Sequence, residues 1–270
     1  MTADEQTYAF ENAIPAQRER LRTLEALLDA DTIRHLEARG VDRGWQCLEV
    51  GAGGGSVATW LSARVAPEGK VVATDLDTTV LRDLSHPNLE VRVHDVLADD
   101  LPGGTFDLIH LRLLLAWLAE PQTALQRLLG ALKPGGWLVA EEMDFVSAAP
   151  DPRMAEEARG LFVRIAAAHN LVLAERHGFD VAYGRRVTGD LEDAGLAEVG
   201  CEGRATMWRG GQAGGRIWRH TIAQLRDPMI ASGLLTAADV DAALALCDDP
   251  SLSSLSPVVM AAWGRRPASS

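Results

Sequence analysis

The stretch from Cys47 to Ala58 constrains the fold of this 270-residue chain more than any other. It begins as a short apolar run that ends at Glu49 and Val50, and it continues as a glycine cluster over 51–55 before a helical pattern. A strand that turns through glycines into a helix is typical of the first turn of a βαβ unit. Glycines suit such a turn because they adopt positive φ angles and let a ligand approach the backbone N–H groups that open the helix. A tight turn without a ligand is the alternative interpretation.

Acidic residues end the next two predicted strands. The strand over 70–74 is followed by Asp75, and the strand over 89–94 is followed by Asp95. Asp75 follows the glycine cluster at roughly the 20-residue spacing at which an acidic residue meets a ribose in nucleotide-binding βαβ units. The carboxylate of Asp95 is suited to an adenine amino group, but aspartate is also common in turns.

Two further strands are predicted, over 106–110 and 137–140. The apolar run 111–118 after the first of them indicates the start of a helix, with Arg112 beside the strand exit. The second strand exits into an acidic cluster, Glu141, Glu142 and Asp144. These carboxylates are expected to form a solvated loop with one helix cap. The alternatives are a site for a cationic substrate, a base, or an oxygen-rich metal site completed by histidine.

Helices are predicted on both sides of this region. The N-terminal pair covers 16–29 and 32–39, with Asp31 capping the second helix, and it acts either as a cover for the sheet edge or as a lid. The remaining predicted elements are helices at 153–172, 186–194, 213–232 and 236–248 and strands at 196–207 and 258–263.

The ordered set of motifs resembles the class I S-adenosylmethionine-dependent methyltransferases. The motifs are Leu48–Gly55, Asp75, Asp95, Phe106–His110 and Leu132–Gly136. The chain is most similar to the bacterial small-molecule branch, which contains ubiquinone/menaquinone methyltransferases and tailoring enzymes of natural-product pathways. The resemblance covers about residues 45–145, and it implies an α/β fold with a Rossmann-like seven-stranded mixed sheet, flanking helices and helical cap or lid elements.

The resemblance implies S-adenosylmethionine as the cofactor, bound at the carboxyl ends of the strands, where open α/β sheets bind ligands. An acidic residue at the end of the first strand is consistent with a cationic ligand. The implied contacts are Glu49, Gly51, Ala52 and Gly53 for the methionine part, Asp75 and Leu76 for the ribose and adenine face, Asp95 and Val96 for the adenine edge, Leu111 and Arg112 for the pocket wall, and Tyr8 from the N-terminal lid.

Three histidines are candidates for catalysis: His110, His169 and His177. Methyl transfer from a sulfonium is an in-line displacement, so the enzyme mainly aligns the reactants and excludes water. A base is needed only where the attacking atom carries a proton, and histidine suits that role near neutral pH. Each candidate also has a structural interpretation: packing at a strand end for His110, a helix end for His169 and a loop for His177.

The composition limits which binding partners and which cellular location are expected for this chain. A formal net charge of −12 argues against nucleic acid, because an acidic surface repels phosphate backbones. No signal peptide and no apolar run of the ~18 residues that a membrane span needs are apparent. Three widely spaced cysteines, Cys47, Cys201 and Cys247, are typical of a reducing cytoplasm and predict no metal site. We therefore expect a cytoplasmic protein without membrane partners; monomer and homodimer stay open.

The sequence thus predicts four segments. These are an N-terminal helical lid over 1–44, a cofactor-binding core over 45–145, a helical substrate cap over 146–190, and C-terminal strands over 191–270 with a helical insertion at 213–248. The predicted function is methyl transfer to a small molecule, in natural-product biosynthesis. A methyltransferase-like enzyme that catalyses cyclisation or rearrangement, a nicotinamide-dependent oxidoreductase, and a non-catalytic protein that binds S-adenosylmethionine are the alternatives.

Overall fold

The computed structural model describes residues 15–268, and the chain divides into two compact units. The sheet unit comprises Leu28–Glu142, Arg185–Gly203 and Met260–Ser270. The helical unit comprises Met1–Leu27, Met143–Gly184 and Arg204–Val259. Each unit is described by itself below, and the four segments expected from the sequence stay a prediction.

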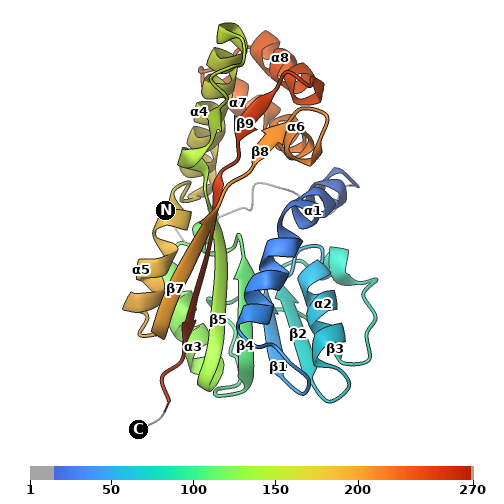
Figure 1. The fold of residues 1–270 in the computed structure, drawn as a ribbon, viewed down its shortest axis with the longest axis vertical. Helices are drawn as coiled ribbons and strands as arrows, with labels where there is room; N and C mark the ends of the chain where they lie inside the picture. Colours follow the sequence, from blue (N-terminus) through green and yellow to red (C-terminus); the bar gives the residue numbers. More distant parts are fainter. Residues whose placement is uncertain (1–14, 269–270) are drawn as a thin grey trace. The chain divides into compact units, whose positions relative to one another are not determined.

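The sheet unit is built on a seven-stranded mixed sheet (Figure 1), as the sequence predicts. Its strands are β1 (Gln46–Val50), β2 (Lys70–Asp75), β3 (Leu89–Val93), β4 (Phe106–Arg112), β5 (Leu132–Asp144), β7 (Ala197–Arg204) and β10 (Val258–Arg265). Their order across the sheet is β3-β2-β1-β4-β5-β10-β7. Strands β3, β2, β1, β4 and β5 pair in parallel, so their carboxyl ends lie along one edge of the sheet.

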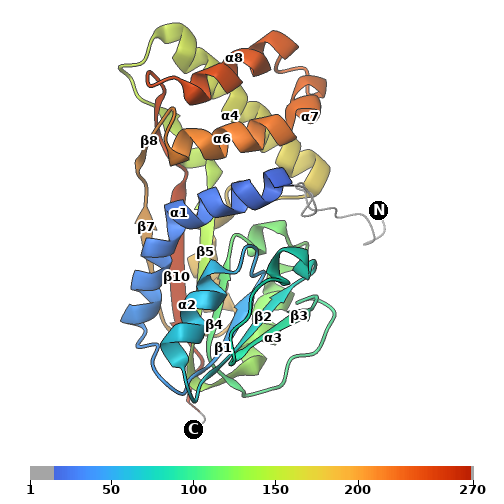
Figure 2. The same ribbon diagram turned by 90° about the vertical axis from the view of Figure 1, so that its right-hand side faces the viewer.

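The helices of this unit form a layer on each face of the sheet (Figures 1 and 2). They are α1 (Pro15–Ala38, within the unit from Leu28), α2 (Ser56–Val65), α3 (Pro121–Ala131) and α5 (Val187–Asp193). Two short 3-10 turns, η1 (Thr78–Leu81) and η2 (Leu115–Trp117), follow strand ends. The central strands are covered on both faces, and their apolar residues Leu48, Leu108 and Ile109 are fully buried.

Helix α1 is a single helix, so the predicted break at Asp31 is wrong. Aspartate and threonine are poor helix formers, but here Asp29 and Thr32 bond side chains of the sheet unit, and those bonds stabilise the helix through the expected break. Near its end, the Arg39 guanidinium lies 4.0 Å from the ring centroid of Trp263, a cation–π contact that ties the helix to β10.

The region after β4 also differs from the sequence prediction. The expected helical start at 111–118 is instead the end of β4, a residue with positive φ at Leu113 (56°), and η2. Strand β5 does not end at Ala140 but continues to Asp144. The pairing of Arg112 with Glu141 explains both results, because each strand extends the other.

Among its described residues, the helical unit contains α1 up to Leu27, four further helices and a three-stranded sheet of order β6-β9-β8. Its elements are η3 (Phe145–Ser147), β6 (Ala149–Pro150), α4 (Glu156–His177), η4 (Tyr183–Arg185, of which Arg185 belongs to the sheet unit), β8 (Met207–Arg209), α6 (Ala213–Gln224), α7 (Arg226–Ala231), α8 (Ala237–Asp248) and β9 (Ser253–Leu255). The strand predicted over 196–207 is divided between β7 and β8. The helix predicted over 213–232 is also divided, because Pro228 cannot continue a helix and is tolerated only in the first turn of a new one.

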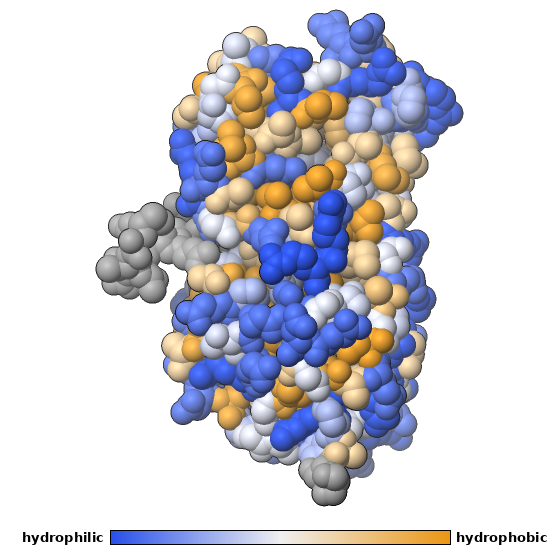
Figure 3. Space-filling view, turned by 90° about the vertical axis from the view of Figure 1, so that its left-hand side faces the viewer, coloured by the Kyte–Doolittle hydropathy of each residue, from blue (hydrophilic) through white to orange (hydrophobic). Residues whose placement is uncertain are grey.

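No helix among residues 15–268 is long and apolar enough to cross a membrane. On the molecular face drawn in Figure 3, hydrophobic residues are interspersed among hydrophilic ones.

Candidate functional site

The glycine turn joins the end of β1 to the start of α2. Gly51, Gly53 and Gly55 have φ angles of 67°, 55° and 85°, which favour glycine at all three positions. A Cβ on Gly55 would lie 2.3 Å from Leu84 Cδ1, so packing requires that glycine. The Gly53 N–H donates to Asp75 Oδ2 at 3.0 Å, which brings the turn against the end of β2.

The carboxylates after β2 and β3 lie at the same edge of the sheet. Asp75 also accepts from the Asp77 N–H at 3.2 Å; burial raises the pKa of Asp75 more than these backbone bonds lower it. Asp95 accepts from the Leu97 N–H at 2.8 Å, and the His94 N–H donates to the Asp75 carbonyl at 3.0 Å, linking the two strand ends. The side chain of Leu76 is exposed although it is apolar.

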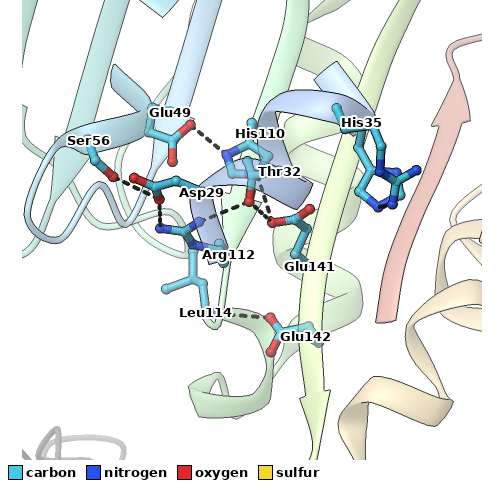
Figure 4. A network of polar contacts seen from close by, with 11 residues as sticks. Asp29, Thr32, His35, Glu49, Ser56, His110, Arg112, Leu114, Glu141 and Glu142 are labelled. Carbon is cyan, nitrogen blue, oxygen red and sulfur yellow. Dashed lines mark hydrogen bonds and ion pairs between the residues drawn. The ribbon is translucent and has the colours of Figure 1, made fainter. Parts of the chain in front are cut away.

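A buried charged network lies at the ends of β1, β4 and β5 (Figure 4). The Nδ1 atom of His110 is 2.7 Å from Glu49 Oε2, and its Nε2 atom is 3.7 Å from Glu141 Oε2. The first contact is a hydrogen bond, and the second is an ion pair that is too long for one. All three side chains are almost completely buried.

The network continues to helix α1. The Thr32 hydroxyl donates to Glu141, and Arg112 donates to Thr32 Oγ1 at 2.9 Å and to Asp29 Oδ1 at 3.0 Å. The Ser56 hydroxyl, at the start of α2, donates to the same oxygen of Asp29 at 3.1 Å. Residues from three strands and two helices therefore form one network, in which the 3.7 Å ion pair of His110 and Glu141 joins two hydrogen-bonded groups (Figure 4).

The pKa of His110 follows from the carboxylates around it. Burial, the largest single influence, lowers this pKa, but attraction to Glu49 and Glu141 outweighs burial and raises the pKa to about 9. The pKa of Glu141 is lowered: burial raises it, and His110, Arg112 and Thr32 together outweigh burial. Three carboxylates (with Asp29) therefore face two cations, so the network carries one net negative charge and suits a cationic ligand.

Glu142, the next residue of β5, shapes the loop after β4. Its Oε1 atom accepts from the backbone N–H groups of Leu114 at 2.9 Å and Leu115 at 2.6 Å. These bonds fix the chain just beyond Arg112.

The expected solvated loop at Glu141, Glu142 and Asp144 is therefore wrong. All three carboxylates are buried in β5, although the Asp144 side chain does cap η3 by accepting from the Val146 N–H. The apolar residue Met143 after the two glutamates was the signal that the strand continues. Asp29 and Thr32 were missed because helix spacing alone gives no sign that they face a strand end.

The structure brings most of the predicted cofactor contacts to one edge of the sheet unit. Those contacts are Glu49, Gly51, Ala52, Gly53, Asp75, Leu76, Asp95, Val96 and Arg112, with His110 among them. Val96 is buried and Leu111 is fully buried. Tyr8 lies outside the described residues. His169 and His177 lie on α4 in the helical unit.

Comparison with known proteins places residues 48–140 in a family described as a methyltransferase domain. The chain is 30% identical over 154 residues to methyltransferase str3 of Strobilurus tenacellus, covering 56% of this chain and 53% of that protein. It is 32% identical over 110 residues to the ubiquinone/menaquinone biosynthesis C-methyltransferase UbiE of Idiomarina loihiensis. That match covers 37% of this chain and 43% of UbiE. The chain thus spans about half of the length of these relatives.

Solved structures share the fold. A Bacillus halodurans protein assigned as a methyltransferase aligns with a TM-score of 0.57 at 17% identity over 88% of this chain and 100% of that one. The phosphoethanolamine N-methyltransferase 2 of Haemonchus contortus aligns with a TM-score of 0.55 at 12% sequence identity. The alignment covers 96% of this chain and 62% of that one. The [4+2]-cyclase SpnF aligns with a TM-score of 0.50 at 18% sequence identity. The alignment covers 89% of this chain and 82% of that one.

The residues present fit the cofactor of this family, S-adenosylmethionine. A glycine turn with positive φ angles, a buried carboxylate near the end of β1 and a second carboxylate at the end of β2 suit its ammonium, sulfonium and ribose groups in charge and hydrogen bonding. Among residues 15–268, no group of three or more His, Cys, Asp or Glu side chains is arranged to hold a metal ion.

Proposed function

We propose that this chain, whose residues 48–140 match a methyltransferase-domain family, transfers a methyl group from S-adenosylmethionine to a small-molecule acceptor. The observation that carries the proposal is the network of one net negative charge, buried beside the glycine turn. A buried carboxylate that lacks full compensation favours a cationic partner, and the cofactor is a cation.

The bound cofactor supplies a methyl group already activated on a sulfonium. The residues of this chain bind the cofactor, orient it toward the acceptor and exclude water. Glu49 holds the ammonium of the methionine part, the carboxylate of Asp75 accepts from the ribose hydroxyls, and Asp95 accepts from the adenine amino group. Leu76, apolar and exposed, flanks the adenine ring.

The three histidines receive different roles in this proposal. His110 is fully buried between two glutamates, so it acts on Glu49 rather than as a base toward the acceptor. His169 and His177 stay predicted contacts of the acceptor.

A small-molecule acceptor is supported by the partial similarity to UbiE, a C-methyltransferase of ubiquinone/menaquinone biosynthesis. The fold shared with SpnF keeps cyclisation as an outcome of the test. A product heavier than the acceptor by one methyl replacing hydrogen supports transfer, and a product of unchanged mass supports rearrangement.

The direct test is isothermal titration of the chain with S-adenosylmethionine, S-adenosylhomocysteine and NADH. Binding of the first two without the third supports the proposal, and binding of NADH alone overturns it. Asp75→Ala should weaken cofactor binding by about 1–3 kcal/mol, the scale of a hydrogen bond to a charged group. Asp77→Ala is the matched control, because Asp77 caps η1 through the Thr79 N–H and has no proposed ligand contact. Equal effects of the two variants would contradict the ribose role of Asp75.

A further inference from the structure

We propose that His110 is a positioning residue: it fixes the Glu49 carboxylate for the cofactor and couples it, through Glu141 and Thr32, to helix α1. This inference rests on the proposed function. It concerns a residue that touches neither the cofactor nor the acceptor but acts through one that binds the cofactor.

The first step is the orientation of Glu49. Its Oε2 atom is 2.7 Å from His110 Nδ1, which leaves the other oxygen for a ligand. A carboxylate at a strand end has free χ rotation unless a neighbour holds it. The imidazole of His110 is itself fixed, because it is fully buried on β4. The backbone of His110 also pairs with that of Glu49 across the parallel strands β1 and β4.

The second step is Glu141, whose Oε2 atom has two competing donors. The Thr32 hydroxyl on α1 hydrogen-bonds this oxygen, while His110 Nε2 lies 3.7 Å from it and has no hydrogen-bond partner of its own. A movement of less than about 1 Å would bring His110 into hydrogen-bond range, given the usual N–H···O distance. Removing either donor therefore changes the contact between Glu141 and the other donor.

The third step is the charge of the network. As an imidazolium, His110 donates from both nitrogens, so it can hold both glutamates at once. As a neutral ring it donates from one nitrogen only, and two buried carboxylates then face each other without a shared cation. The ring then cannot hold both carboxylates at once, so the orientation of Glu49 is no longer coupled to Glu141. Titratable and charged groups around the imidazole come from each packed element: Glu49 on β1, Arg112 on β4, Glu141 on β5, and Asp29, Arg34 and His35 on α1.

The test is a double-mutant cycle read out as the Kd for S-adenosylmethionine, using His110→Gln and Thr32→Val in the full chain. Gln keeps a donor but not the charge, and Val keeps the shape of Thr32 but removes its hydroxyl. Each single variant should weaken binding about 5- to 30-fold, and the double variant should be no weaker than His110→Gln alone, because residues in one network are not additive. His86→Gln, in the loop before β3, is the control and should bind as the wild type does.

A second readout uses the wild type alone, in case His110→Gln does not fold. Its affinity for S-adenosylmethionine should fall as the pH rises through about 9, and the acceptor KM should stay unchanged over the same range. Additive effects in the cycle, or a flat wild-type profile between pH 7 and 10, would overturn the positioning role while cofactor binding stands. Absence of cofactor binding by the wild type would overturn the proposed function itself, and the inference with it.

Discussion

The two fully buried histidines of this chain have opposite charge states. His110, in the sheet unit, lies between Glu49 and Glu141, and its pKa is raised to about 9. His169, in the helical unit, has ring centroids of Phe145 at 5.1 Å and of Trp218 at 5.3 Å, and burial lowers its pKa to about 4. Burial acts in the same direction on both, so the neighbours decide the charge.

The difference shows how each unit uses a polar group in its interior. The sheet unit places a cation where carboxylates of two strands and a helix converge, and the result is a polar site. The helical unit holds an uncharged imidazole whose Nδ1 atom lies 3.0 Å from the Asn170 side chain, among rings at tilted and edge-on angles. Such rings contribute packing rather than charge compensation.

The largest expected effect comes from removing the charge of His110. His110→Phe should destabilise the chain by about 3–5 kcal/mol, because it leaves buried carboxylates without their cation. Urea unfolding at pH 7 measures this value. Adding Glu49→Gln and Glu141→Gln to the variant should recover part of the loss, since the remaining side chains are then neutral. A loss that the added substitutions do not reduce would show that packing, not charge, is the role of His110.

The pH dependence of stability should have opposite signs at the two histidines. The contribution of His110, whose folded pKa lies above the ordinary 6.5, is fully present below pH 6.5 and is lost as the pH rises through about 9. His169 is uncharged in the folded state, so its effect is the reverse. Stability is lost as the pH falls from 6.5 toward 4, by about 3 kcal/mol for a shift of this size.

Unfolding curves from pH 4 to 9.5 for the wild type, His110→Gln and His169→Phe separate the two contributions. His110→Gln should lose the alkaline dependence and also weaken the acidic loss due to Glu141, whose pKa His110 lowers. His169→Phe should lose only the acidic dependence due to His169. The lowered pKa of Glu141 adds a loss of stability below pH 4.5, which should persist in His169→Phe. A changed alkaline dependence in His169→Phe, or an unchanged one in His110→Gln, would contradict the assignment of the alkaline dependence to His110.

The sequence predicts the sheet unit far better than it predicts this contrast. Strand ends after Glu49, Asp75 and Asp95 follow from local patterns of apolar residues, glycines and aspartates, because each depends on a few neighbours along the chain. The mixed seven-stranded sheet is implied by the family resemblance that the order of those patterns carries.

The charged network does not follow from such patterns. Thr32 and Glu141 meet although 109 positions separate them, and nothing near either residue in the sequence marks the contact. Glu141 and Glu142 look like surface residues, since two adjacent glutamates are rarely buried. Only the pairing of β5 with β4 shows that they belong to the interior.

The smallest expected effect is that of His169→Phe at neutral pH. The variant loses the contact with Asn170, which is worth about 0.5–1.5 kcal/mol as a hydrogen bond. It gains an apolar ring that packs against Phe145 and Trp218, so the free energy of unfolding at pH 7 should change by less than about 1 kcal/mol. His110→Gln, measured beside it, provides the contrasting buried histidine. A loss of more than about 3 kcal/mol for His169→Phe would mean that its imidazole has a polar partner as strong as those of His110. The two units would then treat their buried histidines alike.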